Sequence, residues 1–129
     1  HLTVEPGQPQ AERIATFMAR HGAAWGARRE VIDRATYNLA QSVETIVEAF
    51  APTEALEIEA RFDEFNLDLR VSYVGPALEL PHVRPSLEEV MESVEGERRL
   101  AGFMIRRLAD RVEVEHAQGR TSLLFHFDH

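Results

Sequence analysis

The longest regular pattern in the chain runs over residues 27–50, where apolar side chains recur three and four positions apart. The apolar positions are Ile32, Ala35, Leu39, Val43, Ile46, Val47 and Phe50. This spacing puts them on one face of an amphipathic helix. Residues 8–21 have the same spacing, and Gly22 follows them as the expected stop. The pattern therefore predicts two consecutive helices.

Period-two alternation of apolar and polar residues then replaces the helical pattern. Residues 56–62 and 67–73 alternate in this way, and the polar segment 63–66 joins them, which predicts an antiparallel hairpin with one buried face. The same alternation in shorter runs predicts three more strands, over residues 2–5, 112–115 and 123–127. Gly119 is the expected turn between the last two.

Residues 75–96 are irregular, with three prolines followed by an acidic stretch. Within this segment Ser86 and Glu89 form a capping-box pattern, which predicts a short helix over residues 86–94. A third regular helix is predicted over residues 98–110. Its expected inward positions are Leu100, Phe103, Met104 and Leu108.

The predicted order is strand, two helices, two strands, loop, helix, two strands. Antiparallel hairpins with helices between them are typical of an α+β two-layer sandwich. We expect a mixed, mostly antiparallel sheet with helices on one face. The chain has 129 residues, which fits one domain over residues 1–129. Because it begins at His1 rather than Met, we expect it to belong to a longer protein.

Composition excludes several classes of function. The chain has no cysteine, which excludes disulfides, thiol catalysis and cysteine-based zinc sites. Its net charge is −8, so nucleic acid and anionic membrane surfaces are unfavourable partners. No uncharged run approaches the roughly 20 residues that span a bilayer. We expect a cytoplasmic location, alone or as the cytoplasmic part of a membrane-bound protein.

Three segments carry a family resemblance. Residues 71–78 read Val-Ser-Tyr-Val-Gly-Pro-Ala-Leu, residues 103–114 read Phe-Met-Ile-Arg-Arg-Leu-Ala-Asp-Arg-Val-Glu-Val, and residues 119–121 read Gly-Arg-Thr. With the order of elements, they resemble the GHKL ATPase domain over nearly the whole chain. This Bergerat-like fold binds nucleotide in histidine kinases and in anti-sigma-factor serine kinases.

The resemblance implies a Glu-x-x-x-Asn pair on the long helix, in which Glu activates a water and Asn holds Mg²⁺. If Asn38 is the family Asn, the Glu position holds Arg34. If the ends of the helices are aligned instead, the Asn position holds Glu44 and the Glu position holds Ala40. The second register fits the distance to the next strand better, and neither keeps the pair.

The other nucleotide-binding positions are also changed. Tyr73 stands where the family has the Asp that binds adenine, and Gly75 is the one glycine of that box that remains. Gly102 lies one place away from the second glycine box, and Thr121 matches the family threonine. If a nucleotide binds, the resemblance assigns it to Asn38, Glu44, Tyr73, Gly75, Gly102 and Thr121.

We therefore expect a non-catalytic, regulatory or protein-interaction domain of a larger signalling or transport protein, with no catalytic residue, resident metal or cofactor. The expected contact surfaces are the acidic segment 79–97 and the outer face of the long helix. The anti-sigma branch of the family dimerises, so a homodimer is a further expectation.

Two alternatives stay open. One is a divergent anti-sigma-type serine kinase that binds ATP and Mg²⁺. The other is a small-molecule sensor that uses the old nucleotide pocket around Tyr73, Gly75 and Thr121.

Individual residues also have competing interpretations. We interpret Asn38 as a polar residue on the exposed side of the long helix rather than a Mg²⁺ ligand, and Tyr73 as a residue that fills the old pocket. His116 and His126 lie on neighbouring predicted strands, but without cysteine or a His-x-x-x-His pair we expect no zinc. Residues 126–129 are expected to be a disordered tail. Four arginines of the third helix could bind an anion or pair with the acidic segment, namely Arg98, Arg99, Arg106 and Arg107.

Overall fold

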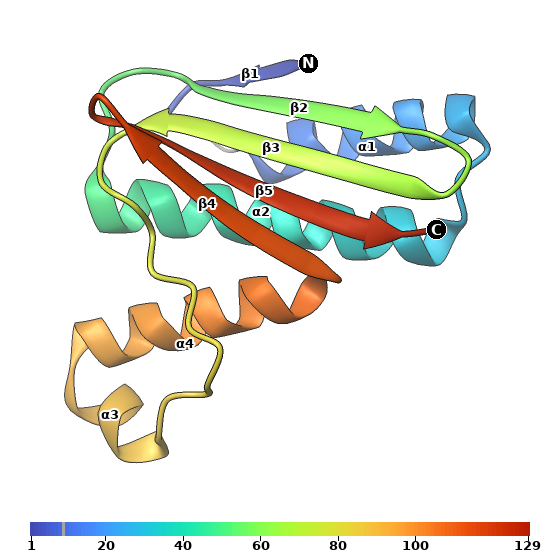
Figure 1. Ribbon diagram of the computed structural model, residues 1–129. Helices are drawn as coiled ribbons and strands as arrows, with labels where there is room; N and C mark the ends of the chain where they lie inside the picture. The colour runs from blue at the N-terminus through green and yellow to red at the C-terminus, as the bar shows by residue number, and fades with distance from the viewer. Residues whose placement is uncertain (9) are drawn as a thin grey trace.

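The computed structural model describes residues 1–8 and 10–129 and confirms an α+β two-layer sandwich. The strands are β1 (Leu2–Val4), β2 (Leu56–Phe62), β3 (Asn66–Val74), β4 (Arg111–Ala117) and β5 (Arg120–Asp128). The helices are α1 (Ala11–Trp25), α2 (Arg29–Phe50), α3 (Leu87–Glu92) and α4 (Val94–Leu108). The helices lie on one side of the sheet, with α3 farthest from it (Figure 1).

The sheet has the order β1-β2-β3-β5-β4, and every pairing among the described strands is antiparallel, whereas we expected a mixed, mostly antiparallel sheet. The predicted hairpin β2–β3 and the predicted C-terminal hairpin β4–β5 are both present, and β3 pairs with β5 between them. In the β3–β5 register Tyr73 lies opposite Thr121. Two candidate residues from distant parts of the sequence are thus brought together.

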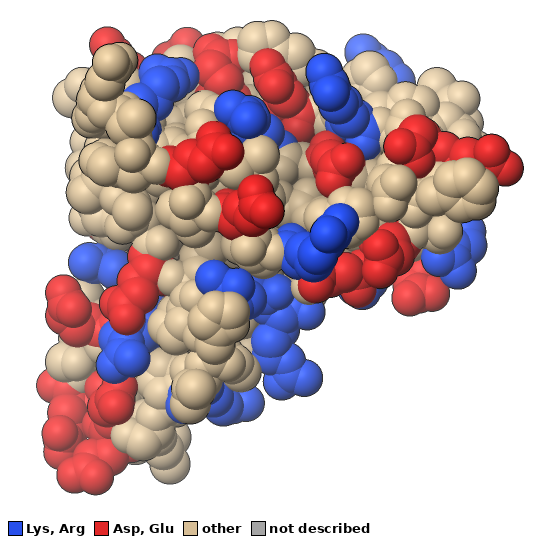
Figure 2. Space-filling model, viewed as in Figure 1, with Lys and Arg blue, Asp and Glu red and all other residues tan. Residues whose placement is uncertain are grey.

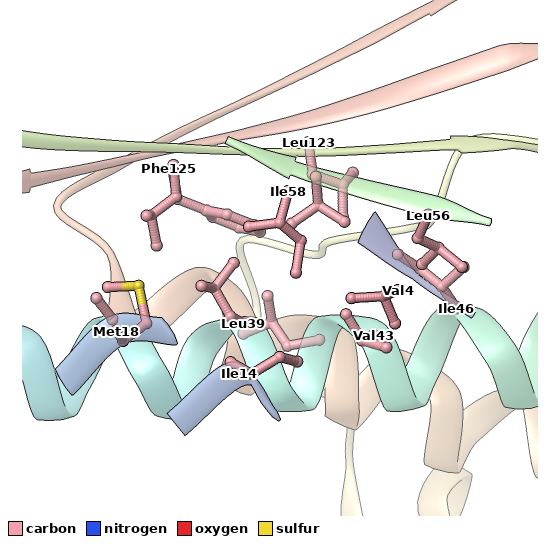
Figure 3. Packing of buried hydrophobic residues seen from close by; sticks show 14 of the residues in the cluster. Val4, Ile14, Met18, Leu39, Val43, Ile46, Leu56, Ile58, Leu123 and Phe125 are labelled. Carbon is pink, nitrogen blue, oxygen red and sulfur yellow. The ribbon is translucent and has the colours of Figure 1, made fainter. Parts of the chain in front are cut away.

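The core lies between the inner face of the sheet and helices α1 and α2. Because strand side chains alternate between faces, every second residue of β3 and β5 is buried. Figure 3 shows side chains of both layers packed together, with Ile14, Met18, Leu39, Val43 and Ile46 from the helices and Val4, Leu56, Ile58, Leu123 and Phe125 from the sheet. None of the helices among the described residues has the length and apolar character required to cross a bilayer.

Helix α1 continues past its predicted stop. Gly22 is a buried position inside the helix, and a Cβ atom there would lie 2.8 Å from Cγ1 of Ile32 on α2. The helix ends instead at Gly26, whose φ of +67° is the left-handed conformation of a C-cap. Gly22 is therefore a close contact between α1 and α2, not a terminator.

Helix α4 begins four residues before its predicted start, and Phe103 is buried as predicted, but one of the predicted inward positions is wrong. Ser93 caps it by accepting a hydrogen bond from the Gly96 amide at 2.9 Å, and the acidic first turn suits the positive end of the helix dipole. Met104, expected to be buried, is 45% exposed, whereas Ile105 is 1% exposed. The predicted short helix α3 is present, and Ser86 caps it as expected.

The C-terminal residues belong to the fold, contrary to the expected disorder. Strand β5 runs to Asp128, and the amide of His129 donates to the carbonyl of Phe65 at 2.8 Å. The His129 ring lies edge-on to Phe62 at 4.9 Å, and its Nε2 accepts from the amide of Arg28 at 2.8 Å. Pairing with β3 along its whole length orders this end of the chain.

Close backbone contacts fix the segment between β3 and α4. A Cβ atom on Gly102 would overlap the carbonyl oxygen of Glu79, and one on Gly96 would overlap the carbonyl oxygen of Glu89. The first contact presses α4 against the loop after β3, and the second presses α3 against α4. Both positions require glycine for space rather than for backbone freedom.

We expect Gly102→Ala to destabilise the fold by about 1–3 kcal/mol, because the added methyl group meets a backbone carbonyl that cannot move away by rotation. Urea unfolding would measure the effect. Helix propensity alone predicts the opposite, a gain of about 1 kcal/mol. A more stable variant would show that α4 does not lie against the loop.

The solvent-facing side of the sheet carries a histidine with a perturbed pKa. The ring of His126 lies 2.6 Å from Oδ1 of Asp68 through Nδ1 and 3.0 Å from Oδ1 of Asp128 through Nε2. The bond to Asp68 raises the pKa of His126 above 6.5, with a smaller contribution from Asp128 and some opposition from desolvation.

Because the pKa of His126 is raised in the folded state, its contribution to stability is fully present below pH 6.5. This contribution is lost as the pH rises through the folded-state pKa. We expect the free energy of unfolding of the protein, relative to His126→Gln, to decline over that window. Urea titrations on both sides of it would measure this difference. A difference that is independent of pH would contradict the ion pair.

Candidate functional site

Asn38 lies on α2 at the contact with α4, and the interpretation of an exposed position is wrong. The residue is fully buried, and its side-chain amide donates to the carbonyl of Ile105 at 3.0 Å. Helix α4 covers this side of α2, which the sequence pattern of α2 alone did not reveal. The Asn38 Oδ1 atom has no hydrogen-bond partner among the described residues.

Ser42 continues the same polar row one turn further along α2. It is fully buried, and its hydroxyl also has no partner in the described part of the chain. Sequence analysis missed this residue. The signal was present, since Arg34, Asn38 and Ser42 are polar residues four apart, beside an apolar face. Asn38 at the α2–α4 contact and Ser42 one turn further along α2 thus each carry a buried oxygen with free acceptor capacity.

The charge near this polar row is unfavourable for a metal ion. Arg34 precedes Asn38 by one turn, so the two side chains are neighbours on the helix surface. Its guanidinium lies 3.8 Å from Asp110 and 5.7 Å from the ring centre of Phe127. In the register that makes Asn38 the family Asn, the resemblance implies a carboxylate at this position, whereas the cationic side chain of Arg34 disfavours Mg²⁺ nearby.

The other alignment of the long helix, which places Glu44 at the family Asn position, involves a different side of α2. Glu44 is exposed, and it follows Asn38 by six residues, so it points about 240° around the helix from it. The row that contacts α4 contains Asn38 and not Glu44. The two registers therefore correspond to different sides of α2, and only the Asn38 side meets α4.

Tyr73, at the end of β3, fills the space between the sheet and the loop that follows. Its hydroxyl donates to the carbonyl of Pro76 at 2.7 Å and accepts from the amide of Leu78 at 3.0 Å. Its ring stacks on Phe50 of α2, with ring centres 6.0 Å apart. Burial raises the pKa of the Tyr73 phenol, which is completely shielded from solvent and stays neutral.

Thr121 and Gly75 join the ends of the two hairpins. The Thr121 hydroxyl donates to the carbonyl of Gly75 at 2.8 Å, and the Gly75 amide donates to the carbonyl of Gly119 at 2.9 Å. His116 Nδ1 lies 2.7 Å from the same hydroxyl, whose proton is already committed. Nδ1 must therefore carry the proton and donate to Thr121.

The loop after β3 lies along α4 at Gly102. Leu78 and Leu80 are buried, and the guanidinium Nε of Arg106 donates to the carbonyl of Leu80 at 2.6 Å. Gly102 allows the carbonyl of Glu79 to approach the helix closely. The space beside Gly102, which lies one place away from the second glycine box of the resemblance, is occupied by the chain's own backbone.

The remaining candidate ligands have partners of their own. Arg99 pairs with Glu79 at 3.2 Å and with Glu89 at 3.0 Å, and Arg98 lies 4.0 Å from Glu95, so both pair with the acidic segment. Within residues 1–8 and 10–129, no group of three or more metal-ligating side chains comes together.

Two hollows lie elsewhere on the surface. One of about 420 Å³ lies on the solvent-facing side of the sheet, between Arg70, Arg111 and His126. Another of about 510 Å³ lies between β1 and α1, near Arg13 and Phe17. None of the six candidate nucleotide-binding residues lines either hollow.

Comparison of the chain with protein-family models gives no match, and comparison with curated proteins gives no significant sequence relative.

Two substitutions on α2 test this description of the site. Asn38→Ala should destabilise the protein by about 1–3 kcal/mol, because it removes a buried hydrogen bond and leaves a cavity. Ser42→Ala, one turn away and equally buried, should be neutral or stabilising, because its hydroxyl has no partner in the described chain. Urea unfolding of both variants measures the difference. Equal losses would contradict the assigned hydrogen bonds.

Proposed function

We propose that this chain is a non-catalytic, histidine-kinase-like ATPase domain that acts as a regulatory, protein-binding module of a larger cytoplasmic signalling or transport protein. It requires neither Mg²⁺ nor ATP. Its partner is another protein or the rest of its own parent chain.

One observation carries the proposal: of the six residues that the family resemblance assigns to nucleotide, four are hydrogen-bonded to the protein itself, namely Asn38, Tyr73, Gly75 and Thr121. Asn38 binds the backbone of α4, and Tyr73 binds the backbone of the loop after β3. Mg²⁺–ATP would have to break these bonds and displace buried Leu78 and Leu80. It would also meet Arg34 where a base is needed. This combination favours a domain that works through its surface.

A second candidate, a divergent Mg²⁺–ATP-dependent serine kinase, is favoured by a separate observation. The Asn38 Oδ1 atom is buried with no partner among the described residues, and amide oxygen is a Mg²⁺ ligand. If α4 moved away from α2, this oxygen would be free to bind the ion. No comparable observation favours the small-molecule sensor, because Tyr73, Gly75 and Thr121 are bonded within the fold.

Thermal unfolding of the protein with increasing ATP, with and without Mg²⁺, separates the two candidates. We expect no shift in Tm. A bound nucleotide at 100 times its Kd would add about 2.7 kcal/mol of stability. A Mg²⁺-dependent, saturable rise would overturn the proposal and favour the kinase.

If Mg²⁺ and ATP do raise the Tm, two variants show which alignment of α2 with the family motif is correct. Asn38→Ala would abolish the Tm shift if Asn38 occupies the family Asn position. Glu44→Gln would abolish it if Glu44 occupies that position. If neither variant changes the shift, the ligand binds outside the family site.

A further inference from the structure

Helix α3 presents large apolar side chains to solvent. It buries none of its own residues, and Leu87 and Met91 are 75% and 77% exposed. They lie one turn apart on the same side of the helix. Val83 before the helix and Val94 after it are also more than two-thirds exposed. Single exposed apolar residues are ordinary, but Leu87 and Met91 form a small apolar patch on α3, and Val83 and Val94 flank this patch along the chain.

The patch is held in a fixed orientation. Ser86 caps α3 and Ser93 caps α4, with hydrogen bonds of 3.2 Å and 2.9 Å. The contact at Gly96 leaves no space between α3 and α4. Figure 1 shows α3 at the end of the molecule away from the sheet. The apolar side chains therefore project from an anchored helix.

Carboxylates lie beside these apolar side chains. Residues 83–97 contain five glutamates and one basic residue, Arg84. Glu89 and Glu95 have arginine partners, but Glu88, Glu92 and Glu97 form no ion pair in the described part of the chain. Figure 2 shows acidic side chains gathered at the end of the molecule away from the sheet, beside uncharged surface. We name Val83, Leu87, Met91 and Val94, with Glu88 and Glu92 beside them, the α3 surface.

We propose that the α3 surface binds a basic amphipathic helix of a partner protein. Burial of the apolar side chains supplies attraction, and the unpaired carboxylates select lysine and arginine on the partner. The same charge repels anionic lipid and nucleic acid. In a symmetric dimer through this surface, glutamates would face glutamates, which disfavours a second copy. This inference deepens the proposed function and rests on it for the biological role of the contact.

The test uses a fluorescent synthetic peptide of leucine and lysine, arranged as an amphipathic helix, titrated with the whole chain and followed by anisotropy. A peptide with glutamate in place of each lysine is the control for charge. We expect the lysine peptide to bind, the glutamate peptide not to bind, and affinity to fall with added salt.

Matched variants locate the contact. Leu87→Ser with Met91→Ser should weaken binding at least about tenfold, because the apolar anchors are lost. Glu88→Gln with Glu92→Gln should weaken it severalfold and reduce the salt dependence. The controls are Phe65→Ser for an exposed aromatic in the β2–β3 turn and Glu54→Gln with Glu64→Gln for exposed charges, and they should leave affinity unchanged. Unchanged Tm values show that every variant is folded.

Four results would overturn the proposal: no binding of the lysine peptide, equal binding by the α3 variants and their controls, equal binding of the glutamate peptide, or concentration-dependent self-association that Leu87→Ser with Met91→Ser abolishes. Self-association of this kind would show that the α3 surface binds a second copy of this chain. Absence of peptide binding together with absence of an ATP shift would overturn this inference alone and leave the proposed function standing.

Discussion

The contact between α2 and α4 decides what the rest of this structure can do. At its centre the buried amide of Asn38 donates to the carbonyl of Ile105. A hydrogen bond in such an environment fixes geometry strongly, because breaking it leaves buried polar groups without partners. With α4 held there, Gly102 meets the loop after β3, and that loop supplies the hydrogen-bond partners of Tyr73. The interior of the candidate site is thus occupied by the chain itself.

The segment between β3 and α4 has two faces with different roles. Its inward residues, Leu78 and Leu80, close the space between the sheet, α2 and α4. Its outward residues on α3 stay exposed with unpaired carboxylates beside them. The same backbone therefore closes the interior and presents an outer surface. The proposed protein-binding role uses the outer surface, whereas a bound nucleotide would need space in the interior.

Sequence patterns predicted the elements well where one period was clear. The apolar face of residues 27–50 and the alternation of the two hairpins correspond to α2, β2, β3 and β5. Predictions failed where tertiary contact decided the outcome. Gly22 was predicted to end the first helix, but it lies inside α1 and packs against Ile32. Asn38 reads as exposed, because nothing in the sequence of α2 reveals that α4 covers it. Residues 126–129 read as a tail because their pairing with β3 is a long-range contact.

The most direct measurement is a nuclear magnetic resonance spectrum of the Asn38 side-chain amide, assigned by its loss in Asn38→Ala. The account predicts nuclear Overhauser contacts from this amide to the backbone around Ile105, slow exchange with solvent, and no change when Mg²⁺ and ATP are added. An amide that exchanges rapidly, or that shifts saturably with Mg²⁺ and ATP, would contradict the claim that α4 is closed on α2 and that the domain works without nucleotide.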